Sequence, residues 1–387
     1  MTVLWESFVG GAHSLGVVGE ECILALDSLG IDVCPRPWNL SALLRRIMYP
    51  HYPTLTAEEA RRDAVLWGPT ALEGMRPRTA ALVQSATRGI GLDEERMALA
   101  MMWGPIGRIS SPGWRHTRAY AAYTYYDFSM LNRSMKASCN VPDLLFVPST
   151  FVRDSVLSSG VETPVHVWHH GVDTATFTPM HRTTDTFTFL FVGVAQQRKG
   201  MGELLQAFHE AFPDSVRDVR LVVKTADWGD PAAWQKDYGS DARILWTWEN
   251  MDRAQLARLM AHTDCMVIPS RAESFCLPLL EGMACGLPVV FTDHGGQRDF
   301  CNGEVGYPIA VRRLEPRIGP VQRQLDGYTS APVWAIPDTD QLVDVLRWVY
   351  SHPGEARAKG AAGSRRAKAW TWTAVTEQVL PILRSLT

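Results

Sequence analysis

Residues 271–290, RAESFCLPLLEGMACGLPVV, contain two glutamates, Glu273 and Glu281, with seven residues between them. The stretch begins after the apolar run DCMVIPS and ends in a second apolar run, PVVFTD. This order predicts strand, loop, helix and strand, with Glu273 in the loop and Glu281 inside the helix. The arrangement raises the question of what two carboxylates would bind there.

The helix in this stretch is predicted to be short. Pro278 suits the first turn of a helix, where its missing N–H costs nothing. Gly286 suits a helix end and Pro288 prevents continuation, so the expected helix covers residues 277–285. Its N-terminus would lie at the carboxyl end of a parallel strand, where α/β sheets bind ligands and where the helix dipole favours an anion.

Carboxylates beside an anion site suggest a ligand of mixed character. A carboxylate accepts hydrogen bonds from hydroxyl pairs, whereas the N–H groups at a helix N-terminus bind a phosphate. A nucleotide sugar, with a diphosphate between two hydroxylated rings, fits both features. For either glutamate alone, a solvated or dipole-stabilising carboxylate is the favoured explanation, and the pair within this strand–loop–helix context shifts the balance toward a ligand site.

The composition indicates a globular protein with two domains. The chain has 387 residues, of which 46% are hydrophobic and 20% charged. A net charge of -3 argues against a nucleic-acid partner. No signal peptide or apolar run of about 20 residues is apparent. The seven cysteines form no CxxC pair, so free thiols and a cytoplasmic location are expected.

Strands alternate with helices in two successive series, which predicts an α/β fold with two Rossmann-like, doubly wound domains facing each other across a cleft. The first series opens with TVLWESFV and the second with FTFLFVGV. Between them PVHVWHHGVDTATFTP loses strand character and suits a linker. The expected boundaries are 1–170 for the first domain, 171–371 for the second and 372–387 for a final helix.

The E-x7-E segment strongly resembles that of the retaining GT-B glycosyltransferases of family 4. Cys276 stands where the family usually has Gly. The resemblance covers the C-terminal half well and the N-terminal half loosely. The matching positions are Glu273, Phe275, Glu281, Met283, Ala284, Gly286, Pro288, Val289 and Val290.

The resemblance implies roles for the residues of this segment. Glu281 would hold the ribose hydroxyls of the donor. Glu273 would hold the hydroxyls of the donor sugar, together with the backbone N–H groups of Phe275, Cys276 and Leu277. The Cys276 departure matters little if only its N–H is used, and more if a sugar presses against it.

Other motifs agree with the same family. FLFVGVAQQRKGMGELLQAF resembles its first strand, loop and helix of the donor domain, in which a basic pair before Gly binds the diphosphate. Arg198 and Lys199 would fill that role, although Val194 stands where a further Arg is usual. HGVDTATFTP resembles the family's linker, with His170 in place of Asn, and WTWTAVTEQVLPIL resembles the last helix, which crosses back to the first domain.

Several further residues are weaker candidates. The loop GGAHSLG follows the first strand and would face the cleft, with Gly11 near the donor and His13 and Ser14 as acceptor-side candidates. Trp248 follows a donor-domain strand and could contact the base. Asp127 ends a first-domain strand, where a structural role and an acceptor contact are equally expected.

No metal site is expected. The sequence Asp-Thr-Asp at residues 338–340 opens a late helix, where Asp is an ordinary cap. The basic stretch RAKGAAGSRRAK is expected to be a solvated helical face, and peripheral membrane contact is possible but not favoured.

The resemblance implies transfer of a sugar from a UDP- or GDP-sugar to an acceptor hydroxyl, with retention at the anomeric carbon. The acceptor would be a hydroxylated small molecule, a glycan or a lipid-linked molecule, and no cofactor would be needed. Arg198, Lys199 and Glu273 would be the catalytic groups. Two alternatives stay open: a GT-B epimerase or phosphorylase, and a non-catalytic nucleotide-sugar-binding module.

Overall fold

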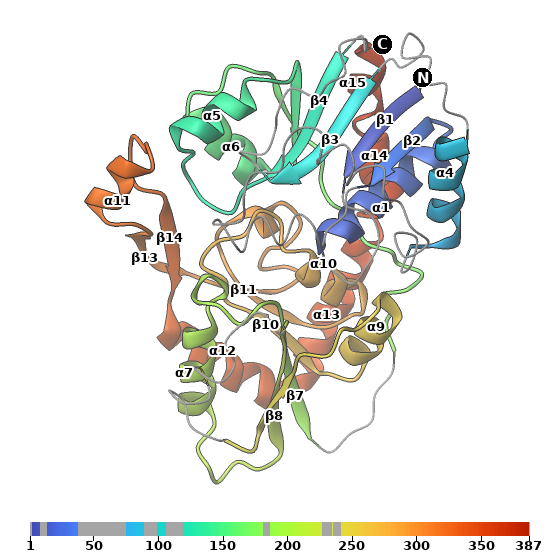
Figure 1. Cartoon of the computed structure of the whole chain (residues 1–387). Coiled ribbons are helices and arrows are strands. Elements are labelled where there is room, and N and C mark those ends of the chain that lie inside the picture. Colours follow the sequence, from blue (N-terminus) through green and yellow to red (C-terminus); the bar gives the residue numbers. More distant parts are fainter. Residues whose placement is uncertain are drawn as a thin grey trace.

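The structure is a computed structural model that describes residues 2–7, 14–37, 75–88, 99–105, 119–180, 186–226, 234 and 241–386. Within these ranges the chain forms two six-stranded parallel sheets and one antiparallel hairpin. Figure 1 shows the two sheets as separate parts of the molecule, one above the other, with helices around each.

The first sheet has the order β2-β1-β3-β4-β5-β6, and every neighbouring pair is parallel. Buried Trp168 stacks on Tyr123 at the centre of its core, with ring centroids 5.2 Å apart. The strands are β1 (Thr2–Ser7), β2 (Asp32–Pro37), β3 (Leu99–Pro105), β4 (Ala119–Tyr125), β5 (Leu144–Val147) and β6 (Val165–Val167), and the helices are α1 (Ser14–Ser28), α4 (Pro77–Arg88), α5 (Arg133–Cys139) and α6 (Thr150–Ser158).

The second sheet has the order β12-β11-β10-β7-β8-β9 and is also parallel throughout. Its strands are β7 (Phe187–Val192), β8 (Val219–Lys224), β9 (Ile244–Thr247), β10 (Cys265–Ile268), β11 (Val289–Thr292) and β12 (Tyr307–Ile309). The α-helices are α7 (Met201–Ala211), α9 (Arg253–Ala261), α10 (Leu277–Ala284), α12 (Thr339–Ser351) and α13 (Pro353–Ala367), and the short 3-10 turns are η3 (Gln197–Lys199) and η4 (Gly296–Asp299). The helix predicted over 277–285 is therefore α10, with Cys285 as its C-cap.

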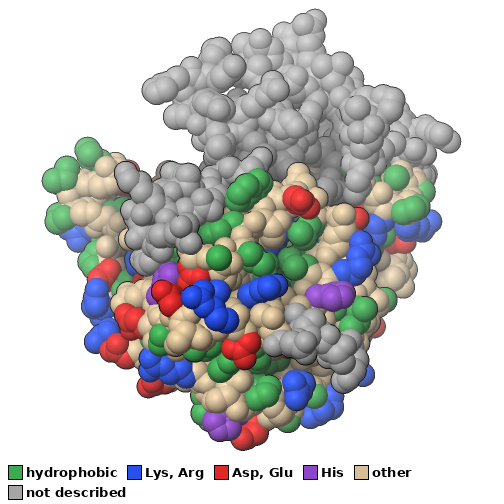
Figure 2. Space-filling view, turned by 90° about the horizontal axis from the view of Figure 1, so that it is seen from below, with side chains coloured by type: hydrophobic (Ala, Val, Ile, Leu, Met, Phe, Trp, Pro, Cys, Tyr) green, Lys and Arg blue, Asp and Glu red, His purple; other side chains and the backbone are tan. Residues whose placement is uncertain are grey.

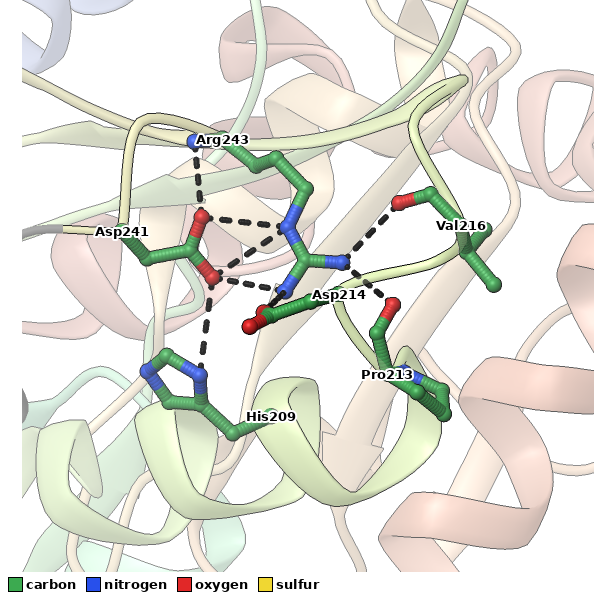
Figure 3. A network of polar contacts seen from close by, with 6 residues as sticks. All are labelled: His209, Pro213, Asp214, Val216, Asp241 and Arg243. Carbon is green, nitrogen blue, oxygen red and sulfur yellow. Dashed lines mark hydrogen bonds and ion pairs between the residues drawn. The ribbon is translucent and has the colours of Figure 1, made fainter.

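A buried arginine ties the end of α7 to the start of β9 (Figure 3). Arg243 donates to Asp241 through Nε and Nη2, and its Nη1 donates to the carbonyls of Pro213 and Val216, each at 3.0 Å. His209 on α7 lies 3.5 Å from Asp241 and completes the cluster. Because the contacts join two connecting segments of the second domain, we assign this network a structural role.

An arm that the sequence analysis did not foresee leaves the second sheet after β12. It consists of β13 (Val311–Pro316), α11 (Pro320–Leu325) and β14 (Val333–Pro337), with β13 and β14 antiparallel. Figure 1 shows the arm at the left, reaching toward the side of the first domain that carries α5. Val321 and Leu325 are about three-quarters exposed on it, and hydrophobic side chains gather at this end of the molecule in Figure 2.

The chain ends in two short helices, α14 (Trp372–Glu377) and α15 (Leu380–Ser385), rather than in the single helix that was expected. Pro381 lies in the first turn of α15 and has no N–H to continue the preceding helix. The two helices bury apolar side chains on one side, because Val375, Val379 and Leu383 are buried and Ile382 is half-buried. Figure 1 shows α14 and α15 beside the first sheet, near the N-terminus, and Trp168 Nε1 donates to Thr376 Oγ1 at 3.3 Å.

The linker runs against the start of this C-terminal segment. Val172 N donates to Trp370 O at 2.8 Å, and Val172 forms a parallel bridge with Thr371. A Cβ at Gly171 would clash with the backbone of Trp372. Glycine at 171 is thus required for a close approach of two chain segments. The domain boundaries at 170 and 371 stay predictions.

Candidate functional site

The two central strands of the second sheet, β7 and β10, bring the main candidates together. The chain turns to one side of β7 to form β8 and returns on its other side as β10, so the switch point of the sheet lies between β7 and β10. Open α/β sheets bind ligands at the carboxyl ends of the strands at such a point. Arg198 and Lys199 follow β7, and Glu273 follows β10.

Lys199 and Glu273 form a close ion pair at this point. Lys199 Nζ lies 2.5 Å from Glu273 Oε1, and Ser270 Oγ donates to the same oxygen at 2.7 Å. Only 5% of the Glu273 side chain and 15% of the Lys199 side chain are exposed. The pair fixes the ammonium in position, and Glu273 Oε2 keeps further capacity to accept hydrogen bonds.

Arg198 lies beside the same carboxylate. Its Nη1 donates to Ala272 O at 2.9 Å and lies 3.3 Å from Asp127 Oδ2 and 3.8 Å from Glu273 Oε2. Burial lowers the pKa of Arg198, but the carboxylates of Asp127 and Glu273 outweigh it and raise that pKa above its ordinary value. The guanidinium is therefore a fixed cation that two carboxylates surround.

Glycine at position 200 sets the approach of this basic pair to β10. Gly200 has a φ of 70° and joins η3 to α7. A Cβ there would clash with Pro269 O, at the end of β10. The Arg-Lys-Gly order thus places two cations directly against the neighbouring strand, which explains why glycine must follow them.

Cys276 occupies a strained backbone position at the N-cap of α10. Its φ is 73° and its ψ 60°, and it is the single non-glycine residue with positive φ in the described ranges. A left-handed conformation costs a residue with a Cβ about 1–2 kcal/mol. The backbone conformation therefore explains why glycine is usual at this position, a reason that the comparison of motifs did not reveal. Burial raises the pKa of the Cys276 thiol well above its usual value, so this cysteine stays protonated.

Glu281 lies deeper than the sequence suggested. It is 1% exposed, and Arg253 Nη2 at the start of α9 lies 2.6 Å from its Oε1. The contact is an ion pair that lacks hydrogen-bond geometry. Burial raises the pKa of Glu281, and Arg253, which also lies over the Phe177 ring at 4.5 Å, opposes that rise. The ribose role of Glu281 stays a prediction, and Arg253 is a neighbour that sequence reasoning missed.

Phe275 packs into an aromatic cluster between the linker and the C-terminal segment. Its ring centroid lies 4.8 Å from that of His170 and 4.9 Å from that of Phe300, with Trp370 at 6.3 Å. Burial lowers the pKa of His170 to about 3. The Phe275 side chain is thus part of the core, and only its backbone could serve a ligand.

A second polar link joins the two domains next to this cluster. Asp299 in η4 accepts hydrogen bonds from the N–H and the hydroxyl of Thr150 in the first domain. His169 Nε2 lies 2.9 Å from Oδ2 of the same Asp299 carboxylate. Hydrogen bonds from His169 and Thr150 overcome the effect of burial and hold the pKa of Asp299 below its ordinary value.

Arg271, two residues before Glu273, is a further residue that sequence reasoning missed. It forms an ion pair with Glu203 on α7 at 2.5 Å, and its guanidinium lies over the Trp334 ring of the arm at 5.4 Å. Arg271 also helps line a pocket of about 230 Å³ between α7 and the base of the arm. It connects the candidate loop to the arm.

The remaining candidates fall in different places. Gly11 and His13 lie outside the described residues, and Ser14 is the first residue of α1. Trp248 follows β9 and is 51% exposed. Leu277 is buried at the start of α10. Their ligand contacts stay predictions.

The Asp-Thr-Asp sequence serves as a helix cap. Asp338 is the N-cap of α12 and accepts from Gln341 N at 3.1 Å, whereas Asp340 lies 3.3 Å from Arg312. In the part of the chain that the structure describes, no three His, Cys, Asp or Glu residues gather as metal ligands would. None of the helices described there is long and apolar enough to cross a bilayer.

Comparison with known proteins finds a family match over part of the chain. Residues 175–314 match the sequence profile of the family Glycosyl transferases group 1. The resemblance of the E-x7-E segment to this family is therefore confirmed for that part of the chain.

Two curated relatives give similar results. An MMP alpha-(1->4)-mannosyltransferase of Mycolicibacterium hassiacum is 27% identical over 258 residues, which cover 66% of this chain and 57% of that protein. A D-inositol 3-phosphate glycosyltransferase of Pseudarthrobacter chlorophenolicus is 30% identical over 219 residues, 52% of this chain and 46% of that protein. The chain spans about half the length of these relatives.

Solved structures extend the likeness over the whole chain. Sucrose-phosphate synthase from Thermosynechococcus elongatus superposes with a TM-score of 0.68 at 17% identity, over 100% of this chain and 99% of that one. HepE of Anabaena, in complex with UDP and glucose, superposes with a TM-score of 0.63 at 14% identity and full coverage of both chains. The predicted fold, two Rossmann-like domains of GT-B type, is confirmed.

Proposed function

We propose that this chain, whose residues 175–314 form a glycosyl transferases group 1 domain, transfers a sugar from a nucleoside diphosphate sugar to an acceptor hydroxyl. One observation carries the proposal: Lys199, Arg198 and Glu273 converge at the carboxyl ends of β7 and β10. A pair of fixed cations suits a departing diphosphate, and a neighbouring carboxylate suits sugar hydroxyls.

In the proposed reaction the configuration at the anomeric carbon is retained. The acceptor oxygen bonds to the anomeric carbon on the face from which the diphosphate oxygen departs. The acceptor proton passes to that phosphate oxygen, so no nucleophilic side chain is required. Lys199 and Arg198 stabilise the charge that develops on the diphosphate, and Glu273 holds both Lys199 and a sugar hydroxyl.

The donor in this proposal is a UDP- or GDP-sugar. The acceptor is a hydroxylated small molecule, a glycan or a lipid-linked molecule. In support, the relatives' names include an inositol 3-phosphate glycosyltransferase and a mannosyltransferase, and HepE of Anabaena has been solved with UDP and glucose. These names describe the relatives and make UDP-glucose and GDP-mannose the first donors to try.

A donor panel tests the proposal. The full chain is screened by thermal shift against UDP- and GDP-sugars, because a bound ligand raises the unfolding temperature by mass action. Any stabilising donor is then incubated with candidate acceptors, and NMR reads the anomeric configuration of the product. Release of nucleoside diphosphate with a retained glycoside supports the proposal. An inverted product, an epimerised donor or binding without turnover contradicts it.

Matched lysine variants connect the result to the site. Lys199→Ala removes the cation beside Glu273, whereas Lys359→Ala removes a lysine that contacts Gly303 and Gly306 instead. Transfer should fall only in the first variant.

The proposed chemistry uses no metal, because Arg198 and Lys199 supply the positive charge. Transfer is therefore expected to continue in excess chelator. Loss of transfer that manganese or magnesium restores would contradict this part of the proposal.

A further inference from the structure

The segment from Tyr126 to Arg133, which follows β4 in the first domain, lies between two parts of the second domain. On one side it contacts the arm formed by β13, α11 and β14. On the other side it contacts the loop that carries Glu273. Figure 1 shows the arm reaching up toward this side of the first domain.

The contacts with the arm are numerous and of different kinds. They combine backbone hydrogen bonds, a buried pair of tyrosine hydroxyls and a cation-π contact, so the arm fixes the position of the whole segment. They are Arg133 N to Gly327 O at 3.0 Å, Val333 N to Ser129 Oγ at 3.1 Å, Tyr126 OH to Tyr328 OH at 3.3 Å, and Arg317 over the Phe128 ring at 4.4 Å.

The contacts with the candidate site are made by one residue of this segment, Asp127. Its Oδ1 accepts a hydrogen bond from Ser274 N at 3.0 Å, one residue after Glu273. Its Oδ2 lies 3.3 Å from Arg198 Nη1. Asp127 is therefore a first-domain carboxylate that lies against the cation assigned to the diphosphate.

A carboxylate that partly neutralises a guanidinium weakens its attraction for a second anion, and Asp127 Oδ2 lies against Nη1 of Arg198. Carboxylates and phosphates both bind arginine through charge-assisted contacts, so a carboxylate beside Arg198 and an incoming phosphate draw on the same positive charge. The side chains of Asp127 and Arg198 are each only 22% exposed, so water screens their attraction only partly.

We infer that Asp127, held in place by the arm, competes with the donor's diphosphate for Arg198. The inference rests on the proposed function and adds a way in which donor binding is regulated. Donor binding and the contact between the two domains are coupled through one guanidinium. A diphosphate that binds Arg198 releases Asp127 from it, and a firm contact between the domains weakens the diphosphate site.

The sign of this coupling can be measured. A carboxylate with a purely structural role could be removed without strengthening diphosphate binding, whereas removal of Asp127 should strengthen it. Asp127→Asn keeps the side-chain volume and an oxygen that can accept from Ser274 N. UDP and GDP, titrated calorimetrically into the full chain, should bind Asp127→Asn about two- to tenfold more tightly than wild type.

Two controls separate this effect from a general one. Asp154→Asn makes the same charge change on α6, at a residue paired with its neighbour Arg153, and should leave the affinity for UDP and GDP unchanged. The nucleosides uridine and guanosine lack phosphate, so their binding should not distinguish Asp127→Asn from wild type.

A variant of the arm tests how Asp127 is held. Tyr328→Ala removes the contact with Tyr126 and should loosen the segment, so that diphosphate affinity rises as in Asp127→Asn. Adding Tyr328→Ala to Asp127→Asn should bring no further gain, because both act on the same ion pair. Thermal unfolding of each variant confirms that it is folded.

The outcomes distinguish this inference from the proposed function. Tighter diphosphate binding by Asp127→Asn, absent for the nucleosides, supports competition at Arg198. Equal or weaker diphosphate binding by the variant, when wild type binds, overturns the inference and leaves the proposed function standing. Absence of diphosphate binding by wild type and variant alike overturns both.

Discussion

Replacing Glu281 by Gln tests the least accessible part of the candidate site. Glu281 is 1% exposed, and its Oε1 lies 2.6 Å from Arg253 Nη2. Breaking a buried ion pair costs about 3–5 kcal/mol when the remaining charge stays uncompensated. The Arg253 side chain is 23% exposed, and glutamine avoids the burial of a carboxylate, so we expect a loss of about 1–2 kcal/mol in unfolding free energy.

The same substitution should weaken nucleotide binding if Glu281 holds the ribose. Loss of a charge-assisted hydrogen bond of about 1.5–3 kcal/mol corresponds to about a 10- to 150-fold weaker affinity for a nucleoside diphosphate. Calorimetric titration measures the affinity, and urea unfolding measures the stability. The free nucleotide is the right probe, because the ribose contact does not depend on the sugar.

Arg253→Met serves as the matched control. It breaks the same ion pair and retains packing on Phe177, but it leaves the Glu281 carboxylate in place. Both variants should lose stability, and their combination should lose less than the sum of the two. Only Glu281→Gln should lose nucleotide affinity. If Glu281→Gln binds nucleoside diphosphate as wild type does, the ribose assignment is wrong.

The remaining predictions concern Lys199, His170 and the C-terminal helices. Lys199→Ala should lower transfer by about 100-fold or more at saturating donor. It should lower the unfolding free energy by only about 1–2 kcal/mol, because Ser270 still donates to Glu273. A change in turnover of only a few-fold would argue against the diphosphate role. Burial lowers the pKa of His170 to about 3, so below pH 6.5 the folded chain binds fewer protons than the unfolded chain. The unfolding free energy should therefore decrease as the pH is lowered from about 6.5 to about 3, by up to about 1.4 kcal/mol per pH unit. His170→Asn should remove that part of the slope in urea unfolding at pH 7 and 5, and parallel curves would contradict the assignment. Truncation after residue 371 removes α14 and α15 and should lower the melting temperature and transfer together, whereas full activity of the truncated chain would show that these helices are dispensable.

Much of the fold could be predicted because apolar runs alternate with helical patterns in both halves of the chain. The strands of both sheets outside the poorly patterned region 41–110 follow such runs, and Pro278 and Gly286 mark the limits of α10 closely. The arm could not be predicted in this way. Its first strand, β13, is largely exposed and contains Arg312 and Arg313, so it lacks the apolar alternation that identifies a half-buried strand. Its second strand, β14, is apolar and partly buried but has only five residues.

The candidate site shows the same division. Lys199 and Glu273 could both be placed at the ligand-binding edge from sequence, because each follows a strand and parallel strands end at the same edge of a sheet. Their ion pair appears only in the structure. The partners of Glu281 and Arg198 could not, since Arg253 and Asp127 come from distant segments that only the packed chain brings close. The sequence showed a cysteine at position 276 where the family usually has glycine. Only the structure shows that this residue has a left-handed backbone.

The central claim is that Arg198 and Lys199 hold a diphosphate, and one comparison of affinities tests it most directly. UDP, GDP, UMP and GMP are titrated into the full chain under the same ionic conditions. The account predicts that at least one diphosphate binds about tenfold or more tightly than its monophosphate, since charge-assisted bonds to the second phosphate add about 1.5–3 kcal/mol. Equal affinity for the diphosphate and the monophosphate of each base would contradict it.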